Sequence, residues 1–224
     1  MKLWKTCLLA AAVTGLAAAF NGCIVPCLQP LFSEKEQLFD QALLGAWTKD
    51  DTTYEFSREA PDNSEYRVLV IDKKGRKSVL GVQLGKIGDR QYLCGALDLE
   101  SMPGECAWFA FPPHFLIFRV EQIRPQLKLT LLNVEAFQAL LAATPAVVPH
   151  VMLKPTDAKE KDAIPLLTAS TAELQAFIRK YADSAKLFPE KDVMTFEPVA
   201  GKTPASAPAP AAPETAPAAV PKKG

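Results

Sequence analysis

Histidine is scarce in this chain of 224 residues, which contains two, His114 and His150. Neither stands beside a serine or cysteine in a recognisable nucleophile motif, and the sequence has no Gly-x-Ser-x-Gly motif and no glycine-rich phosphate loop. We therefore predict that the protein is not an enzyme and uses no cofactor. The competing hypothesis, an envelope hydrolase, requires a cleft in which His114 or an acidic pair meets a nucleophile.

The chain also lacks an excess of charge of either sign, because 25 Lys and Arg residues balance 25 Asp and Glu residues. Residues 1–22 and 201–224 each contribute +2, so residues 23–200 carry about −4. A nucleic-acid partner requires a basic patch that neutralises phosphates. The mildly acidic body argues against such a partner.

No apolar run is long enough to cross a membrane, since a spanning helix needs about 20 apolar residues. The longest candidate, residues 7–20, has 14 uncharged and mostly apolar positions and follows Lys2 and Lys5. A short positive start before a run of this length is typical of a secretory signal peptide, which we place at residues 1–22.

Two cleavage sites compete at the end of this segment, and an uncleaved anchor is a third interpretation. Residues 17–19 are three alanines, the small-residue pattern of an ordinary signal peptidase site, which would leave Phe20 as the first mature residue. The segment 20–23, Phe-Asn-Gly-Cys, instead resembles a bacterial lipobox, in which Cys23 is acylated and becomes the first residue. The resemblance predicts a lipid anchor at Cys23, and Gly22 fits the motif, whereas Phe20 and Asn21 depart from it.

Acylation at Cys23 predicts a protein of the cell envelope that is held to a membrane by lipid. Each buried methylene contributes about 0.8 kcal/mol to such an anchor. Ile24 follows the cysteine where an aspartate would resemble an inner-membrane retention signal. The expected location in a Gram-negative host is therefore the outer membrane, facing the periplasm.

The remaining cysteines are too few and too scattered for a zinc site. Cys94 and Cys106 flank one predicted loop and form a candidate disulfide, or they are two small buried apolar residues. Cys27 is then free, or paired with Cys23 if no lipid is added. Close ligand pairs are missing around Cys94, Cys106 and His114, so we expect no metal.

Composition divides the mature chain into three parts. Residues 23–32 contain two prolines and are predicted to form a lipidated stalk, and residues 33–200 are predicted to form a β-rich globular domain. Residues 201–224 are dominated by alanine and proline without a large apolar side chain, so we expect a disordered tail. The tail is either a solvated extension or a spacer that reaches a partner.

Alternating apolar residues indicate a run of short antiparallel strands after Trp47. The predicted strands are residues 52–57, 66–71, 78–84, 91–97, 106–111, 114–123 and 126–132, with a final short strand at 193–196. So many closely spaced strands predict an antiparallel meander or a partly closed barrel.

Two later segments, and a short earlier one, are predicted to be helical. Asn133 can cap a helix that runs to about residue 143, and residues 170–173 form a capping box before an apolar stripe at 174, 177, 178 and 181. Ser33 and Glu36 form a second capping box. Three prolines predict a loop at 144–155, which would leave His150 exposed. The predicted fold class is α+β and mostly β, with two to three helices packed on the sheet.

Two stretches resemble a group of bacterial lipoproteins. The first runs from Cys23 through Pro30-Leu31 to Leu43-Leu44-Gly45-Ala46-Trp47, and the second is the helix-containing stretch 167–177. Members begin with a cysteine, continue with Pro-Leu and enter a Leu-x-Gly-x-Trp strand. No activity is established for the group, so the resemblance implies an anchor and a β-domain without implying a reaction.

Gly45-Ala46-Trp47 is also similar to the Gly-x-Trp of lipocalin first strands. That resemblance implies that Trp47 plugs one end of a barrel and packs against a basic side chain from the last strand. Trp47, Trp108 and Phe118 then line an apolar pocket, or they fill an ordinary core. The leading hypothesis is a membrane-tethered, non-enzymatic β-domain that binds an envelope protein or an apolar ligand, and the alternative is a secreted lipocalin-like carrier.

Overall fold

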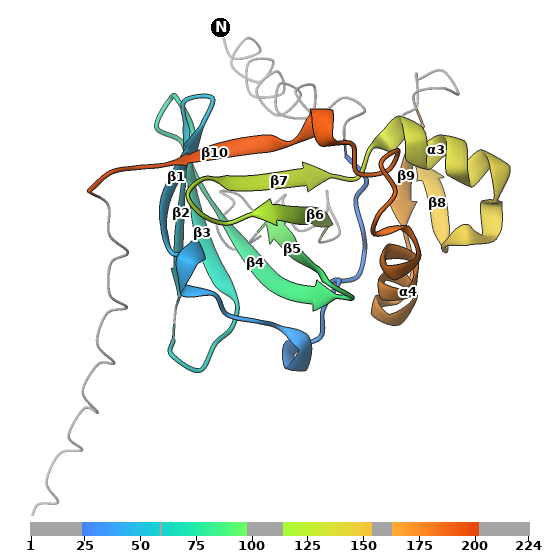
Figure 1. Ribbon diagram of the computed structural model, residues 1–224, viewed down its shortest axis with the longest axis horizontal. Coiled ribbons are helices and arrows are strands. Elements are labelled where there is room, and N and C mark those ends of the chain that lie inside the picture. The colour runs from blue at the N-terminus through green and yellow to red at the C-terminus, as the bar shows by residue number, and fades with distance from the viewer. Residues whose placement is uncertain (1–23, 59, 98–113, 154–162, 202–224) are drawn as a thin grey trace, which may run out of the picture.

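The computed structural model describes residues 24–58, 60–97, 114–153 and 163–201. Within these residues, eight antiparallel strands close into a barrel, and a small two-stranded sheet and two α-helices lie on one side of it (Figure 1). The predicted fold class is confirmed, and the barrel is closed. The predicted signal peptide, Cys23, the predicted strand at 106–111 and the tail after Gly201 lie outside the described residues.

The barrel is a meander that the last strand completes. Seven consecutive strands lie side by side, and β10 inserts between β7 and β1 to close the ring. The strands are β1 (Gly45–Lys49), β2 (Thr52–Arg58), β3 (Tyr66–Ile71), β4 (Lys77–Ile87), β5 (Arg90–Leu97), β6 (Phe115–Gln122), β7 (Leu127–Leu131) and β10 (Met194–Pro198). A closed barrel leaves no free sheet edge, so all eight strands have partners on both sides.

A two-residue turn sets the register between β1 and β2. Lys49 pairs with Thr52, and the turn residues Asp50 and Asp51 have φ angles of 48° and 61°. Positive φ at both central positions is the type I′ geometry, whose twist matches that of the flanking strands. Aspartate tolerates this region at a cost, whereas Asn-Gly adopts it readily.

We expect the double substitution Asp50→Asn/Asp51→Gly to raise the free energy of unfolding by about 1 kcal/mol, because it relieves the left-handed backbone strain. Urea unfolding followed by circular dichroism measures this change. The same replacement at the exposed turn residues Lys73 and Lys74 is the control, because neither has a positive φ. An unchanged midpoint for the Asp50/Asp51 variant would contradict the turn assignment.

The two α-helices begin where the sequence predicts. The Asn133 side chain accepts from the Ala136 amide (2.9 Å) before α3 (Val134–Ala143). The capping box of Ser170 and Glu173 is complete at the start of α4 (Thr171–Tyr181). Ser33 and Glu36 also form their capping box, but the helix that follows is the single 3₁₀ turn η1 (Glu34–Glu36).

Further 3₁₀ turns connect the larger elements. They are η2 (Gln41–Leu43), η4 (Pro145–Val147) and η6 (Glu190–Asp192).

The prediction of a loop at 144–155 is wrong for its second half. Residues His150–Leu153 form strand β8, which pairs antiparallel with β9 (Ile164–Leu167). The three prolines lie outside β8, so they do not interrupt its ladder. His150 is accordingly a half-buried strand residue, and its Nδ1 lies 2.9 Å from the Val148 carbonyl oxygen.

The segment that follows Cys23 is part of the folded core, so the predicted stalk is corrected from Ile24 onward. Cys27 exchanges backbone hydrogen bonds with Phe115 of β6, at 2.9 and 2.8 Å. On its other side the chain runs parallel to β9, since the Leu28 amide donates to the Leu167 carbonyl (2.9 Å). The segment therefore joins the small sheet to the barrel.

The buried apolar side chains of the described residues form two clusters. One fills the barrel, and the other lies outside it, between the outer face of β5 and β6 and the elements α3, β9 and α4. Phe32 connects the N-terminal segment to β4, where a side chain at Gly85 would collide with the Phe32 ring.

Candidate functional site

Trp47 is fully buried and lies against the turn between β6 and β7. Its indole Nε1 donates to the Leu43 carbonyl (2.9 Å), and the Arg124 guanidinium carbon lies 4.5 Å from the centre of its ring. Arg124 also donates to the carbonyls of Ala42 and Leu44, at 2.9 and 3.2 Å. A basic side chain does stack on Trp47, but it comes from the β6–β7 turn and not from the last strand.

The barrel interior is filled by side chains. Trp47 and Phe118 belong to the same apolar cluster, whose buried members are at most 8% exposed. Those members are Leu43, Trp47, Phe56, Tyr66, Val68, Val82, Leu84, Leu93, Val120, Leu127, Leu129 and Phe196. Eight strands enclose a space that side chains can just fill. Trp47 and Phe118 therefore contribute to a packed core, which is one of the two interpretations that the sequence left open, and Trp108 lies outside the described residues.

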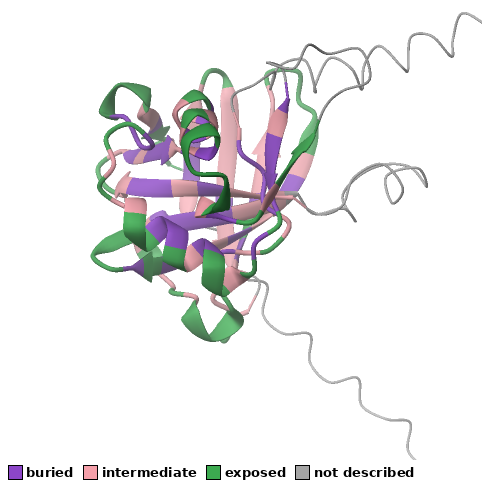
Figure 2. Cartoon of the chain, turned by 90° about the vertical axis from the view of Figure 1, so that its right-hand side faces the viewer, coloured by how far each residue is buried: buried purple, intermediate pink, exposed green. Residues whose placement is uncertain are grey.

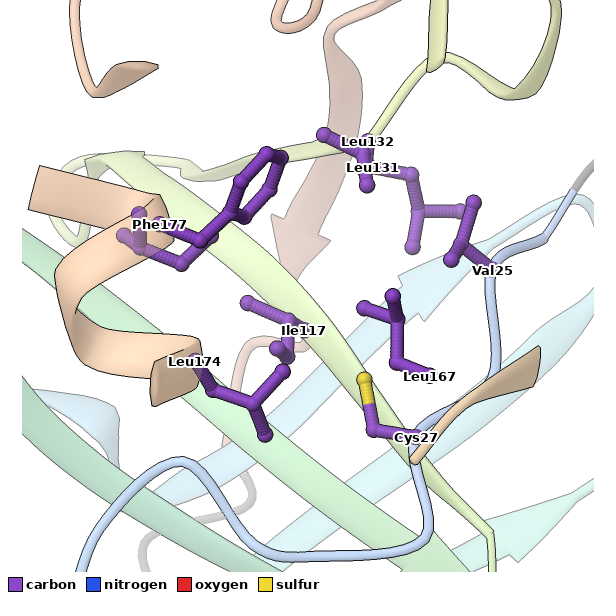
Figure 3. Close-up of a pocket in the computed structure, with 9 residues that line it drawn as sticks. Val25, Cys27, Ile117, Leu131, Leu132, Leu167, Leu174 and Phe177 are labelled. Carbon is purple, nitrogen blue, oxygen red and sulfur yellow. The ribbon is translucent and has the colours of Figure 1, made fainter. Parts of the chain in front are cut away.

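A small cavity lies outside the barrel, under α4. Val25, Cys27, Ile117, Leu167, Leu174 and Phe177 converge on it from the N-terminal segment, β6, β9 and α4 (Figure 3). Its volume is about 10 Å³. That is about one water-sized sphere, whereas ligand pockets have volumes of about 300–1,000 Å³. This cavity is a packing defect of an apolar core.

A larger hollow of about 290 Å³ lies on the surface near the β4–β5 turn. It is lined by Lys86, Asp89, Arg90, Gln91, Val120 and Glu121, so its walls are mostly polar. Apolar ligands require mostly apolar walls. The hollow fits water and ions better than such a ligand.

A buried polar network that the sequence did not reveal ties the barrel to its outer layer. Arg119 is 6% exposed and donates to the Glu121 carboxylate (2.6 Å) and to the carbonyls of Ala182 (2.8 Å) and Phe188 (3.2 Å). The Thr130 hydroxyl donates to the same Glu121 oxygen (2.8 Å). Because the donors and acceptors of these groups are used within the network, it is suited to holding the segment after α4 in place.

The Tyr92 hydroxyl lies close to this network but is buried without a hydrogen-bond partner in the described structure. Burial raises the pKa of Tyr92 to about 12. The phenol therefore stays neutral at physiological pH. The sequence did not single out Tyr92, because the residue has the position of an ordinary outward-facing strand residue.

The described cysteines are buried thiols. Cys94 accepts a hydrogen bond from the Leu31 amide (3.3 Å), and burial raises its pKa to about 12. The pKa of Cys27 is raised as well, mainly by burial and to a smaller extent by the electrostatic effect of Cys94. Neither forms a disulfide with another described residue. Cys106, the predicted disulfide partner of Cys94, lies outside the described residues, so this pairing stays a prediction.

His114 and the acidic pair Asp50 and Asp51 are the remaining candidate polar residues. His114 is half-buried immediately before β6, and burial lowers its pKa. Asp50 and Asp51 occupy the exposed β1–β2 turn, where Asp50 pairs with Lys49. Over the described ranges, no group of three His, Cys, Asp or Glu side chains is placed to hold a metal ion.

Among the same residues, no helix has the length and apolar character needed to cross a membrane. Comparison with known proteins gives no match to a protein family, to a curated protein or to a solved structure. The barrel and its outer layer are therefore the basis for a functional proposal.

Proposed function

We propose that this protein is an exported lipoprotein, attached to a membrane of the cell envelope through an acylated Cys23. Its barrel acts as a non-enzymatic scaffold that binds a partner protein. The observation that carries the proposal is the burial of residues directly after Cys23. Val25 is 5% exposed, and Cys27 is fully buried, so the described core begins two residues after the candidate acylation site. A chain cleaved before Cys23 would keep every described element.

The filled barrel supports a protein partner over an apolar ligand. A carrier needs an interior of a few hundred cubic ångströms, whereas here Trp47 and its neighbours occupy the interior. The stack of Arg124 on Trp47 supports the lipocalin resemblance for barrel architecture only. A partner would bind the outer surface, because a rigid barrel presents fixed side chains and loops.

The proposed location is the outer membrane, facing the periplasm, if the host is Gram-negative. Ile24 supports this placement because an aspartate at that position would resemble a retention signal. The proposal includes no metal, no cofactor and no nucleic acid.

Mass spectrometry of the protein purified from its native host tests the lipid anchor and the exclusion of an apolar ligand. Under denaturing conditions, we expect a chain that begins at Cys23 and carries added hydrocarbon. Under non-denaturing conditions, we expect no stoichiometric apolar ligand. The variant Cys23→Ser should lose the hydrocarbon, whereas Cys7→Ser, which changes a cysteine before the cleavage site, should retain it.

Two results would overturn the proposal separately. A mature chain that begins at Phe20 without hydrocarbon removes the anchor. A tightly bound lipid or other apolar molecule in the non-denaturing spectrum removes the scaffold role and supports the carrier.

A further inference from the structure

One face of the molecule is built from a long uncharged stretch. Residues 136–153 contain no Asp, Glu, Lys or Arg, although charged residues make up 22% of the chain. An average stretch of this length holds about four charges. The exposed residues in it are Ala139, Ala142, Ala143, Thr144, Pro145, Ala146, Pro149, Val151, Met152 and Leu153. We name this set, which spans α3, η4 and β8, the uncharged face.

The most apolar part of the uncharged face is strand β8. Val151, Met152 and Leu153 are 45%, 43% and 43% exposed, and they are three of the four large apolar side chains that are exposed in the described residues. Successive strand residues point to opposite faces, so Val151 and Leu153 lie on one face of the small sheet and Met152 on the other. Together they surround the outer edge of β8, and a group of exposed apolar residues of this kind marks an interaction site. Within the described ranges, β8 pairs only with β9.

The strand register places this group at the same end of the small sheet as the start of the described N-terminal segment, with β9 between them. Cys27 is level with Leu167 of β9, which is level with His150 of β8. The N-terminal segment runs parallel to β9, so a step from Cys27 back towards Cys23 corresponds to a step from His150 towards Leu153.

Few residues separate the start of the described N-terminal segment from the candidate acylation site. At the edge of the small sheet, Leu153 is paired with Ile164, and the described N-terminal segment ends at Ile24. From Cys23 to the buried Val25 the chain reaches at most about 7 Å.

The ribbon shows the same arrangement. The start of the N-terminal segment, α3, β8 and β9 lie on one side of the barrel (Figure 1), and Figure 2 views the molecule from that side. An acyl chain on Cys23 would therefore bring this side of the protein against the bilayer.

We propose that the uncharged face is a membrane-contact surface, which lies in the headgroup region of the phospholipid bilayer that holds the Cys23 anchor. This inference rests on the proposed acylation. The free energy falls when apolar side chains enter the membrane interface, and an uncharged surface avoids the cost of dehydrating charges. The edge of β8 that pairs with no described strand limits the depth, because backbone amides and carbonyls there must stay hydrated.

An environment-sensitive fluorophore on one added, exposed cysteine tests the contact, since Cys27 and Cys94 are buried. The acylated full mature chain, with Cys106→Ser to remove a competing thiol, carries the label at Met152→Cys or, as the matched control, at Leu38→Cys. Leu38 is 40% exposed and belongs to the barrel side, where it pairs with Leu84. Leu153→Cys is a second test position in case the first variant folds poorly.

In phosphatidylethanolamine and phosphatidylglycerol vesicles, we expect the label at Met152 to shift to the blue. Brominated acyl chains should quench it by about half or more, because it lies at the interface. The label at Leu38 should emit as it does in water. Water-like emission at both Met152 and Leu153 in acylated protein overturns the contact surface and leaves the anchor intact.

The remaining outcomes separate this inference from the proposed function. If Cys23 carries no lipid, the anchor fails, and a blue shift of the unacylated chain with vesicles would support the surface by itself. If the shift needs no vesicles and grows with protein concentration, a second copy of the chain covers β8, and the membrane contact is overturned.

Discussion

Replacing Arg119 with methionine is expected to lower the free energy of unfolding by about 3–5 kcal/mol. The substitution leaves the Glu121 carboxylate without its guanidinium partner, and it leaves the carbonyls of Ala182 and Phe188 without a donor. An uncompensated charge in a largely buried site is costly, because the protein interior solvates it poorly. Urea unfolding followed by far-ultraviolet circular dichroism measures the loss.

The double variant Arg119→Met/Glu121→Met is the control for this explanation. It removes the lone carboxylate together with the guanidinium, so it should be less destabilised than the single variant. If the double variant loses as much stability as Arg119→Met and Glu121→Met together, the two charges do not interact. The explanation of the Arg119→Met loss by an uncompensated carboxylate would then be contradicted.

Replacing Trp47 with alanine is expected to destabilise the protein by about 3–5 kcal/mol, because it empties a fully buried volume in the barrel. The loss includes the hydrogen bond from the indole to the Leu43 carbonyl and the stack with Arg124. Chemical denaturation followed by circular dichroism is suitable, since the readout does not depend on tryptophan fluorescence.

Two further variants separate these contributions. Trp47→Phe keeps most of the apolar volume and should lose less, and Arg124→Gln should lose about 1–2 kcal/mol through the stack and the backbone contacts. A loss below about 1 kcal/mol for Trp47→Ala would mean that the barrel end is loosely packed. That result would favour the ligand-carrier alternative.

The filled barrel and the buried N-terminal segment change how the tether is expected to work. A flexible stalk would let the domain rotate freely above a membrane. A core that already includes Val25 instead gives the proposed lipid anchor little slack, so one face of the domain would be directed at the bilayer. The opposite side of the barrel would then be available to a partner protein.

Local sequence patterns were sufficient for much of the fold. The capping box of Ser170 and Glu173 defines the start of α4 because both groups are three residues apart and act on the same turn. Alternation of apolar residues defines strands such as β6 because successive side chains point to opposite faces. These signals depend on neighbours in the chain, so they can be read without a structure.

Features that depend on distant partners were missed. The four residues of β8 have too little local pattern to predict a strand, and pairing with β9 stabilises them. Pro26 and Pro30 make the N-terminal segment look irregular, but hydrogen bonds to β6 and β9 draw it into the core. Arg119 reads as an exposed strand residue until the segment after α4 covers it.

The sequence by itself determined the period of the strands, the starts of the two α-helices and the position of the candidate signal and cysteine, because each is written in residues close together along the chain. Only the tertiary structure decided that β10 closes the barrel beside β1 and that the interior is full. It also decided that the uncharged face and the start of the N-terminal segment lie on the same side of the barrel (Figure 1). Those outcomes depend on which surfaces meet after long chain reversals, and burial of apolar area selects them for the molecule as a whole.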